Sequence, residues 1–301
     1  MSQLFRGLGV ALITPFKQDG EIDYDALERL IEHTIKGGVD YIVSLGTTGE
    51  AITLNAKECR QVLDFTIDRI NGRIPIVAGH FGGNDTLGLM QRIKEFDFKK
   101  IDGILSSSPS YNKPSQEGIY RHYCAVAEVS PRPIIIYNVP SRTASNVEAE
   151  TLIRLARQCP NVVAVKDASA NMIQGMKTIQ DKPEHFSVLS GDDPTTLPLL
   201  GVGGEGVISV IANLFPKEFA GVVHNAMNGN IAEARFYNDL LQDIHPWLYK
   251  DGNPSGIKAA MHIMGMCENV LRLPLVPCCE ATFNGLKKEL GKIADKAGTY
   301  S

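Results

Sequence analysis

Lys166 is the residue whose setting most clearly suggests covalent chemistry. It lies near the end of a short, almost wholly apolar run, NVVAVKDAS, at residues 161–169. Strands of this composition are buried on both faces in parallel sheets, so an ammonium group at the end of one is partly removed from water. Desolvation favours the neutral amine, which is a nucleophile. The alternative is a strand-end lysine that reaches solvent or pairs with Asp167.

Other residues suited to proton transfer or carboxylate binding also follow apolar runs. A lysine, two tyrosines, a threonine and an arginine could meet if these runs end at the same edge of a sheet. Each signal is weak alone, because a tyrosine at a strand end usually packs and GTTG often forms a simple turn. The candidates are Thr47 and Thr48 in GTTGE, Tyr111 in SSSPSYNKP, Tyr137 and Arg142 in YNVPSRT, and Gly191 in SGDD.

The elements that must position these residues alternate between strands and helices. A helical pattern ends at Gly37 and Gly38, and another begins with Asn55 and Glu58 at capping-box spacing. Eight strand–helix units within about 220 residues predict a (β/α)8 barrel, in which catalytic residues follow the carboxyl ends of the strands. The predicted strands are residues 9–13, 41–45, 76–78, 103–105, 134–137, 162–166, 187–189 and 207–210.

The strand signals stop after about residue 221. Helical patterns at residues 231–241 and 257–268 follow, so we expect a barrel over residues 1–221 and a helical C-terminal domain over residues 222–301. The glycine-rich GVGGEG at residues 201–206 precedes its strand and belongs to the rim opposite the candidate residues. We assign it to tight backbone packing and not to phosphate binding.

Composition excludes several classes of function. The 301 residues are 44% hydrophobic and 21% charged, and the net charge of −4 offers no basic surface for nucleic acid. The start of the sequence lacks a signal-peptide pattern and no apolar run approaches a membrane span, so we expect a cytoplasmic protein. We expect no metal, because the seven histidines show no ligand spacing. The six cysteines lack CxxC pairs and are expected to be reduced.

The motifs together resemble the dihydrodipicolinate synthase (4-hydroxy-tetrahydrodipicolinate synthase) family, within the pyruvate-dependent class I aldolase superfamily. The resemblance extends over nearly the whole chain through GVALITPF, GTTGE, YNKPSQEG, YNVPSRT, VKDAS, SGDD, GVISV, NPSGIKAAM and LRLPLVP. It implies that Lys166 forms an imine with pyruvate and that the resulting enamine attacks L-aspartate-4-semialdehyde. It implies no metal or organic cofactor.

The resemblance also implies a role for each candidate residue. Tyr137 is the general acid and base, and Thr47 links it to Tyr111, which serves the site of a neighbouring subunit. Arg142 binds the carboxylate of the semialdehyde. The pyruvate carboxylate meets the backbone of Thr47 and Thr48, with main chain of Gly191 and Ile208 lining the pocket. The expected assembly is a homotetramer built from two tight dimers.

Some positions depart from the family pattern. Ala144 replaces a usual glycine after YNVPSRT, and His80 stands where threonine is common, either near the site or in loop packing. Positions that hold a lysine inhibitor in some members are Ala56, Cys59, Gly88 and Ser110, with Asn84 retained. These changes predict weak or absent lysine feedback.

Two other functions stay open at this stage. A related aldolase that acts on sialic acid or a 2-keto-3-deoxy sugar acid would share the lysine and tyrosine without needing Arg142. A noncatalytic barrel is the other alternative, which intact Lys166, Tyr137 and Thr47 disfavour.

Overall fold

The chain folds into a closed barrel of eight parallel strands, seen in a computed structural model that describes residues 4–298. Neighbouring strands follow chain order, and β8 pairs with β1 to close the barrel. Every strand end lies within two residues of its predicted position, so the predicted (β/α)8 barrel is confirmed. The strands are β1 (Gly7–Ala11), β2 (Tyr41–Ser44), β3 (Ile76–Ala78), β4 (Gly103–Ser107), β5 (Ile134–Asn138), β6 (Val162–Asp167), β7 (Ser187–Ser190) and β8 (Gly206–Ser209).

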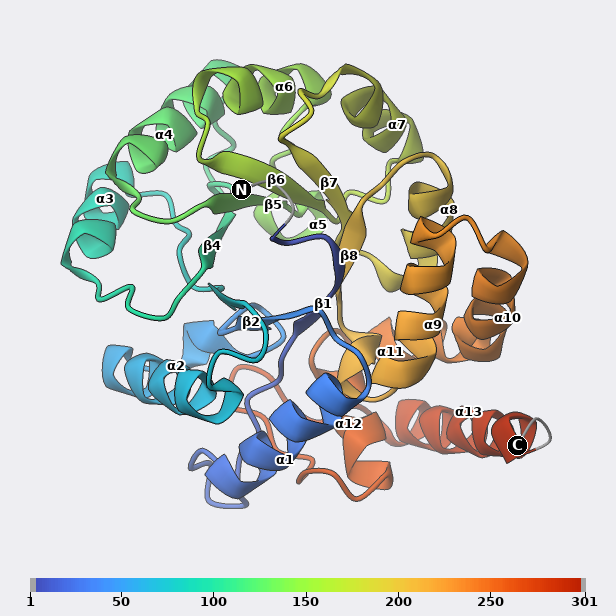
Figure 1. Ribbon diagram of the computed structural model, residues 1–301. Coiled ribbons are helices and arrows are strands. Elements are labelled where there is room, and N and C mark those ends of the chain that lie inside the picture. The colour runs from blue at the N-terminus through green and yellow to red at the C-terminus, as the bar shows by residue number, and fades with distance from the viewer. Residues whose placement is uncertain (1–3, 299–301) are drawn as a thin grey trace.

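Helices form a ring around the strands (Figure 1). The predicted capping box of α2 is present, because Asn55 Oδ1 accepts from Glu58 N and Glu58 Oε2 accepts from Asn55 N. The barrel helices are α1 (Tyr24–Lys36), α2 (Ala56–Ile70), α3 (Thr86–Glu95), α4 (Gln116–Val129), α5 (Pro140–Thr143), α6 (Ala149–Gln158), α7 (Met172–Asp181), α8 (Thr196–Gly201) and α9 (Pro216–Met227). Beyond them follow α10 (Ile231–Leu241), α11 (His245–Tyr249), α12 (Ser255–Ile263) and α13 (Glu280–Gly298).

The proposed domain boundary at residue 221 falls inside α9. This helix contacts β1 and β8, so it completes the eighth strand–helix unit of the barrel. We therefore propose that the helical C-terminal domain begins after Met227. Helix α12 is shorter than the predicted pattern at residues 257–268, because the chain leaves the helix at Met264 and Gly265 has a φ of +72°.

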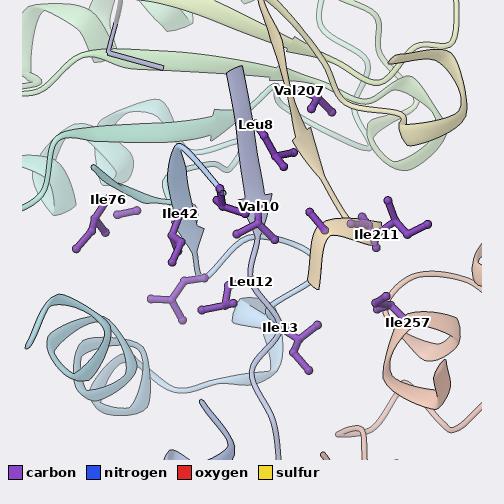
Figure 2. Packing of buried hydrophobic residues seen from close by; sticks show 14 of the residues in the cluster. Leu8, Val10, Leu12, Ile13, Ile42, Ile76, Val207, Ile211 and Ile257 are labelled. Atoms are coloured by element: carbon purple, nitrogen blue, oxygen red, sulfur yellow. The ribbon is translucent and has the colours of Figure 1, made fainter. Parts of the chain in front are cut away.

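Two apolar cores hold the fold together. The larger one fills the layer between strands and helices, and Figure 2 shows part of it, with Val10 of β1, Ile42 of β2 and Ile257 of α12. The smaller one fills the inside of the barrel and includes Tyr41 and Leu189. Side chains alternate between the two cores along the strands except in β6, where Val163 and Ala164 both belong to the smaller core. Because both faces are buried, the strands read as continuous apolar runs.

In the glycine-rich segment at residues 201–206, the predicted tight packing is found only in the second half. Gly201 is exposed, and a Cβ on it would meet nothing within 4 Å. Gly206 has a φ of +152°, and a Cβ on it would lie 2.3 Å from the carbonyl oxygen of Gly7. Only glycine fits there, where β8 begins beside β1. Among residues 4–298, no helix combines the length and apolar character needed to cross a membrane.

Candidate active site

Lys166 and Tyr137 lie side by side near the carboxyl ends of their strands. They are register partners on β6 and β5, and both side chains are buried, with 5% and 9% exposed. Lys166 Nζ lies 4.4 Å from the centroid of the Tyr137 ring. An amine and a phenol that adjoin in a sheltered interior can exchange protons with a bound substrate.

Asp167, the next residue, does not pair with Lys166. Its Oδ1 accepts a hydrogen bond from Asn138 Nδ2 at 3.2 Å and another from Ser169 N at 2.9 Å. Burial raises the pKa of the Asp167 carboxyl, although these hydrogen bonds act in the opposite direction. Within residues 4–298, Lys166 forms no ion pair, which favours the nucleophile interpretation over the alternative of a strand-end ion pair.

The barrel is filled at its amino-terminal end. The Phe5 and Tyr41 rings meet edge to face with centroids 5.7 Å apart, and both are buried. Gly9 makes room for this packing, because a Cβ there would lie 2.3 Å from the Tyr41 ring. These buried rings close the interior at this end, and in barrels of this type substrates bind at the opposite, carboxyl-end rim.

The GTTGE loop after β2 lies at this rim, with its two threonines in different settings. Thr48 is 2% exposed, and its Oγ1 accepts a hydrogen bond from Asn253 Nδ2 at 3.0 Å. Thr47 is exposed, and within residues 4–298 its hydroxyl has no hydrogen-bond partner. The expected link from Thr47 to Tyr137 is therefore not formed inside a single chain.

A buried ion pair fixes the end of the same loop to the C-terminal domain. Glu50, in a left-handed conformation with a φ of +53°, places Oε1 2.5 Å from Lys258 Nζ of α12, and both side chains are fully buried. Glu50 Oε2 accepts from the backbone N–H of Arg272 at 3.1 Å. The Arg272 guanidinium in turn binds Glu58 at the start of α2, at 2.7 and 2.9 Å. Helix α12 and the segment after it therefore determine where the loop sits.

Arg142 reaches toward the same part of the C-terminal domain. It belongs to the short helix α5, is exposed, and donates from Nη2 to the carbonyl oxygen of Asn253 at 3.2 Å. Asn253 thus contacts both Thr48 and Arg142, a link that we did not predict. Its only sequence signal is its place in the NPSGIKAAM motif.

Tyr111 points away from the rest of its own chain. Its side chain is 91% exposed and its φ is +68°, an unusual value for a tyrosine. Its backbone N–H donates to the Thr143 carbonyl oxygen at 3.1 Å, which anchors the loop next to Arg142. The geometry of one chain therefore brings Lys166 and Tyr137 together but leaves Tyr111 apart from them.

The last two predicted residues belong to neighbouring strand ends. Gly191 follows β7, and its N–H donates to the Asp167 carbonyl oxygen at 2.8 Å. Ile208 of β8 is buried in the inner core. Between them Asp193, which we did not predict, accepts from the Ile211 N–H at 2.7 Å and from the Tyr249 hydroxyl at 3.2 Å. It joins the β7 and β8 loops to α11.

His80 lies in an aromatic cluster. Its ring centroid is 4.5 Å from that of Phe81 and 5.6 Å from that of Phe96. Burial lowers the pKa of His80 to about 4, with a smaller effect from the Arg92 charge. These contacts favour the packing interpretation. In the described part of the chain, no group of three or more histidine, cysteine or acidic residues is arranged to hold a metal ion.

Comparison with known proteins agrees with this geometry. The Dihydrodipicolinate synthetase family model matches residues 4–293. The 4-hydroxy-tetrahydrodipicolinate synthase of Azobacteroides pseudotrichonymphae genomovar. CFP2 is 47% identical over 287 residues, 95% of this chain and 97% of that protein. The synthase of Parabacteroides distasonis is 47% identical over 291 residues, 97% and 98% of the two chains. The crystal structure of dihydrodipicolinate synthase from Aquifex aeolicus has a TM-score of 0.91 at 42% identity and covers 96% of this chain and 98% of that one.

Proposed function

The chain belongs to the dihydrodipicolinate synthetase family, and we propose that it condenses pyruvate with L-aspartate-4-semialdehyde to form 4-hydroxy-tetrahydrodipicolinate. One observation carries the proposal: Lys166 is buried, has no carboxylate partner among the described residues, and places its Nζ 4.4 Å from the Tyr137 ring inside the barrel. The names of the relatives supply the identity of the product.

In the first half of the reaction, Lys166 Nζ attacks the ketone carbon of pyruvate and water is lost, giving an imine. The imine withdraws electrons, so the pyruvate methyl group loses a proton and an enamine forms. Tyr137 is adjacent to Nζ and is assigned the proton transfers of these steps. No metal or organic cofactor is required, because the covalent imine is itself the electron sink.

In the second half, the enamine carbon attacks the aldehyde carbon of the semialdehyde. The amine of this substrate then attacks the imine carbon, closes the ring and releases Lys166. Arg142 is assigned to the substrate carboxylate, because a guanidinium offers two parallel donors to a carboxylate. Arg142 is exposed on α5, and only its Nη2 donates to Asn253, so the guanidinium has further donors for a substrate entering from the rim.

The pyruvate carboxylate is assigned to the GTTGE loop. Backbone N–H groups of Thr47 and Thr48 bind it, and main chain of Gly191 and Ile208 lines the opposite wall. The buried Glu50–Lys258 pair supports this assignment, because it holds the loop in one position before substrate arrives.

Tyr111 is assigned to the active site of a second copy of the chain. The Tyr111 side chain is 91% exposed, and the Thr47 hydroxyl has no partner within residues 4–298. Both observations fit a relay in which Tyr111 of one subunit reaches Thr47 of another. We propose that two such dimers form a homotetramer. We also propose that the enzyme acts in the cytoplasm, which a biosynthetic role on small metabolites supports.

Lysine is proposed to be at most a weak inhibitor. Cys59 is buried, with its Sγ 3.8 Å from the Ala51 carbonyl oxygen, and offers no charge to an amino acid. Asn84 is already engaged, since its Oδ1 accepts from the Ser110 N–H at 2.8 Å. Ala56 and Gly88 have neither a charged nor an aromatic side chain with which to bind lysine.

The test is a product assay with purified protein, pyruvate and one aldehyde at a time. We expect turnover with L-aspartate-4-semialdehyde and formation of the cyclic product, which is detected by chromatography and mass spectrometry. Turnover with N-acetylmannosamine or a sugar aldehyde, and none with the semialdehyde, would assign the chain to the related aldolases instead.

A further inference from the structure

Two cysteine sulfurs lie in contact outside the proposed active site. The Sγ atoms of Cys124 and Cys159 are 3.4 Å apart. Cys124 is on α4 and partly exposed, whereas Cys159 directly follows α6 and is buried. A disulfide bond is about 2.05 Å long, so the sulfurs need to approach by about 1.4 Å.

Contacts on both sides of the sulfurs already hold α4 against the end of α6. Arg154 of α6 pairs with Glu117 at 2.6 Å and lies 3.4 Å from the centroid of the Tyr120 ring. Beyond the sulfurs, Asn161 Nδ2 donates to the Ala127 carbonyl oxygen at 2.8 Å. One face of α4, with residues three or four apart, makes all of these contacts: Glu117, Tyr120, Cys124 and Ala127. The sulfurs are therefore held in register by contacts on either side.

The backbone at Cys159 can adjust to a covalent bond. Cys159 is the C-cap of α6, with φ −122° and ψ 87°, outside the helical conformation. A cross-link requires side-chain rotation at the two cysteines and a small shift of this turn.

We propose that Cys124 and Cys159 are a thiol–disulfide exchange site, at which a small disulfide such as oxidised glutathione converts the pair into an intramolecular disulfide. The Cys124 thiolate attacks one sulfur of the reagent, whose S–S bond breaks and releases one thiol. Cys159 then loses its proton to solvent and attacks Cys124 Sγ, which expels the second thiol. The two cysteines lose two electrons, and the reagent is reduced to two thiols.

The order of attack follows from exposure. Cys124 is reached first, because Cys159 is buried and burial raises the pKa of its thiol to about 12. The second step is therefore slow, and it succeeds because the two sulfurs are held in contact.

The exchange site is distant from the proposed chemistry. Cys159 lies before β6 at the amino-terminal end of the barrel, and Lys166 lies near the carboxyl end of the same strand. Because the strand rises by about 3.3 Å per residue, most of its length separates the disulfide from the amine. We expect turnover to survive both cross-linking and removal of either thiol.

Peptide mapping tests the proposal. The native protein is incubated with oxidised glutathione, denatured, alkylated with N-ethylmaleimide, digested without reductant and analysed by mass spectrometry. We expect a cross-linked species in which Cys124 is joined to Cys159, and alkylation of the other four of the six cysteines. Alkylation of both residues, or glutathione that stays on Cys124 without cross-linking, would overturn the proposal.

Variants supply the controls. Cys124→Ser and Cys159→Ser should each abolish the cross-link and keep turnover, which shows that they are folded. Cys278→Ser removes a cysteine outside this pair and should leave the cross-link intact. A cross-link that appears only after denaturation, or one that Cys278→Ser abolishes, would contradict the assignment.

Discussion

Replacing Lys258 with methionine tests whether the C-terminal domain fixes the GTTGE loop. Lys258 Nζ lies 2.5 Å from Glu50 Oε1, with both side chains fully buried, and also donates to the Val270 carbonyl oxygen at 3.0 Å. Lys258→Met leaves the Glu50 carboxylate buried without its counter-charge. Removing one partner of a buried pair typically costs about 3–5 kcal/mol, so we expect a loss of unfolding free energy of that size.

The pair itself contributes less than this loss. Burial lowers the pKa of Lys258, and the attraction of Glu50, which raises it, does not fully compensate. The desolvation of the two charges thus offsets much of their attraction. The double variant Glu50→Gln/Lys258→Met should therefore lose less free energy than the two single variants added together, by at least about 1 kcal/mol.

The assay is urea unfolding at one fixed protein concentration, combined with steady-state kinetics. Lys292→Met is the matched control, because its pair with Glu289 at 2.8 Å is partly exposed and solvent weakens such pairs. A displaced loop should raise the KM for pyruvate by roughly tenfold in Lys258→Met, as expected for the loss of one well-placed contact. If Lys258→Met costs no more than Lys292→Met and leaves this KM unchanged, the anchoring argument is wrong.

Other predictions concern the proposed reaction and its pH dependence. Tyr137→Phe should lower kcat by roughly 10²–10⁴-fold in the product assay, and an unchanged kcat would remove Tyr137 as the general acid and base. Arg142→Lys should raise the KM for the semialdehyde by roughly tenfold and spare that for pyruvate, and equal effects on both would contradict its role. Because the pKa of His80 falls to about 4 in the folded state, the protein should lose stability as pH drops from about 6.5 toward 4. In thermal unfolding, His80→Phe should lose less stability over this pH window than the unchanged protein. If the stability of both proteins falls in parallel with pH, the reasoning is wrong. Lysine at roughly millimolar concentration should leave most activity intact, whereas complete inhibition at micromolar lysine would exclude weak feedback.

Local sequence patterns were sufficient to predict the barrel and the strand ends that carry Lys166 and Tyr137. The alternation of short apolar runs with helical periodicity depends on neighbours in sequence, and parallel strands bring their carboxyl ends to one rim. The register of β5 and β6 then sets Tyr137 beside Lys166. The family resemblance, and not the periodicity, supplied the roles of these residues.

The contacts that shape the rim could not be predicted in this way. Asn253 meets Thr48 across 205 positions of sequence, and Lys258 meets Glu50 across a similar span. Such pairs depend on how the C-terminal domain docks on the barrel, which no local pattern encodes. The relay through Tyr111 stays a prediction, because it requires a second subunit.

The proposed reaction begins with covalent binding of pyruvate by Lys166. Reduction with borohydride in the presence of pyruvate, followed by peptide mapping, tests it most directly. We predict an N-(1-carboxyethyl) group on Lys166 alone, with loss of activity in proportion to labelling, and no label in Lys166→Met. A reduced adduct on a different lysine, or normal turnover by Lys166→Met, would contradict the claim.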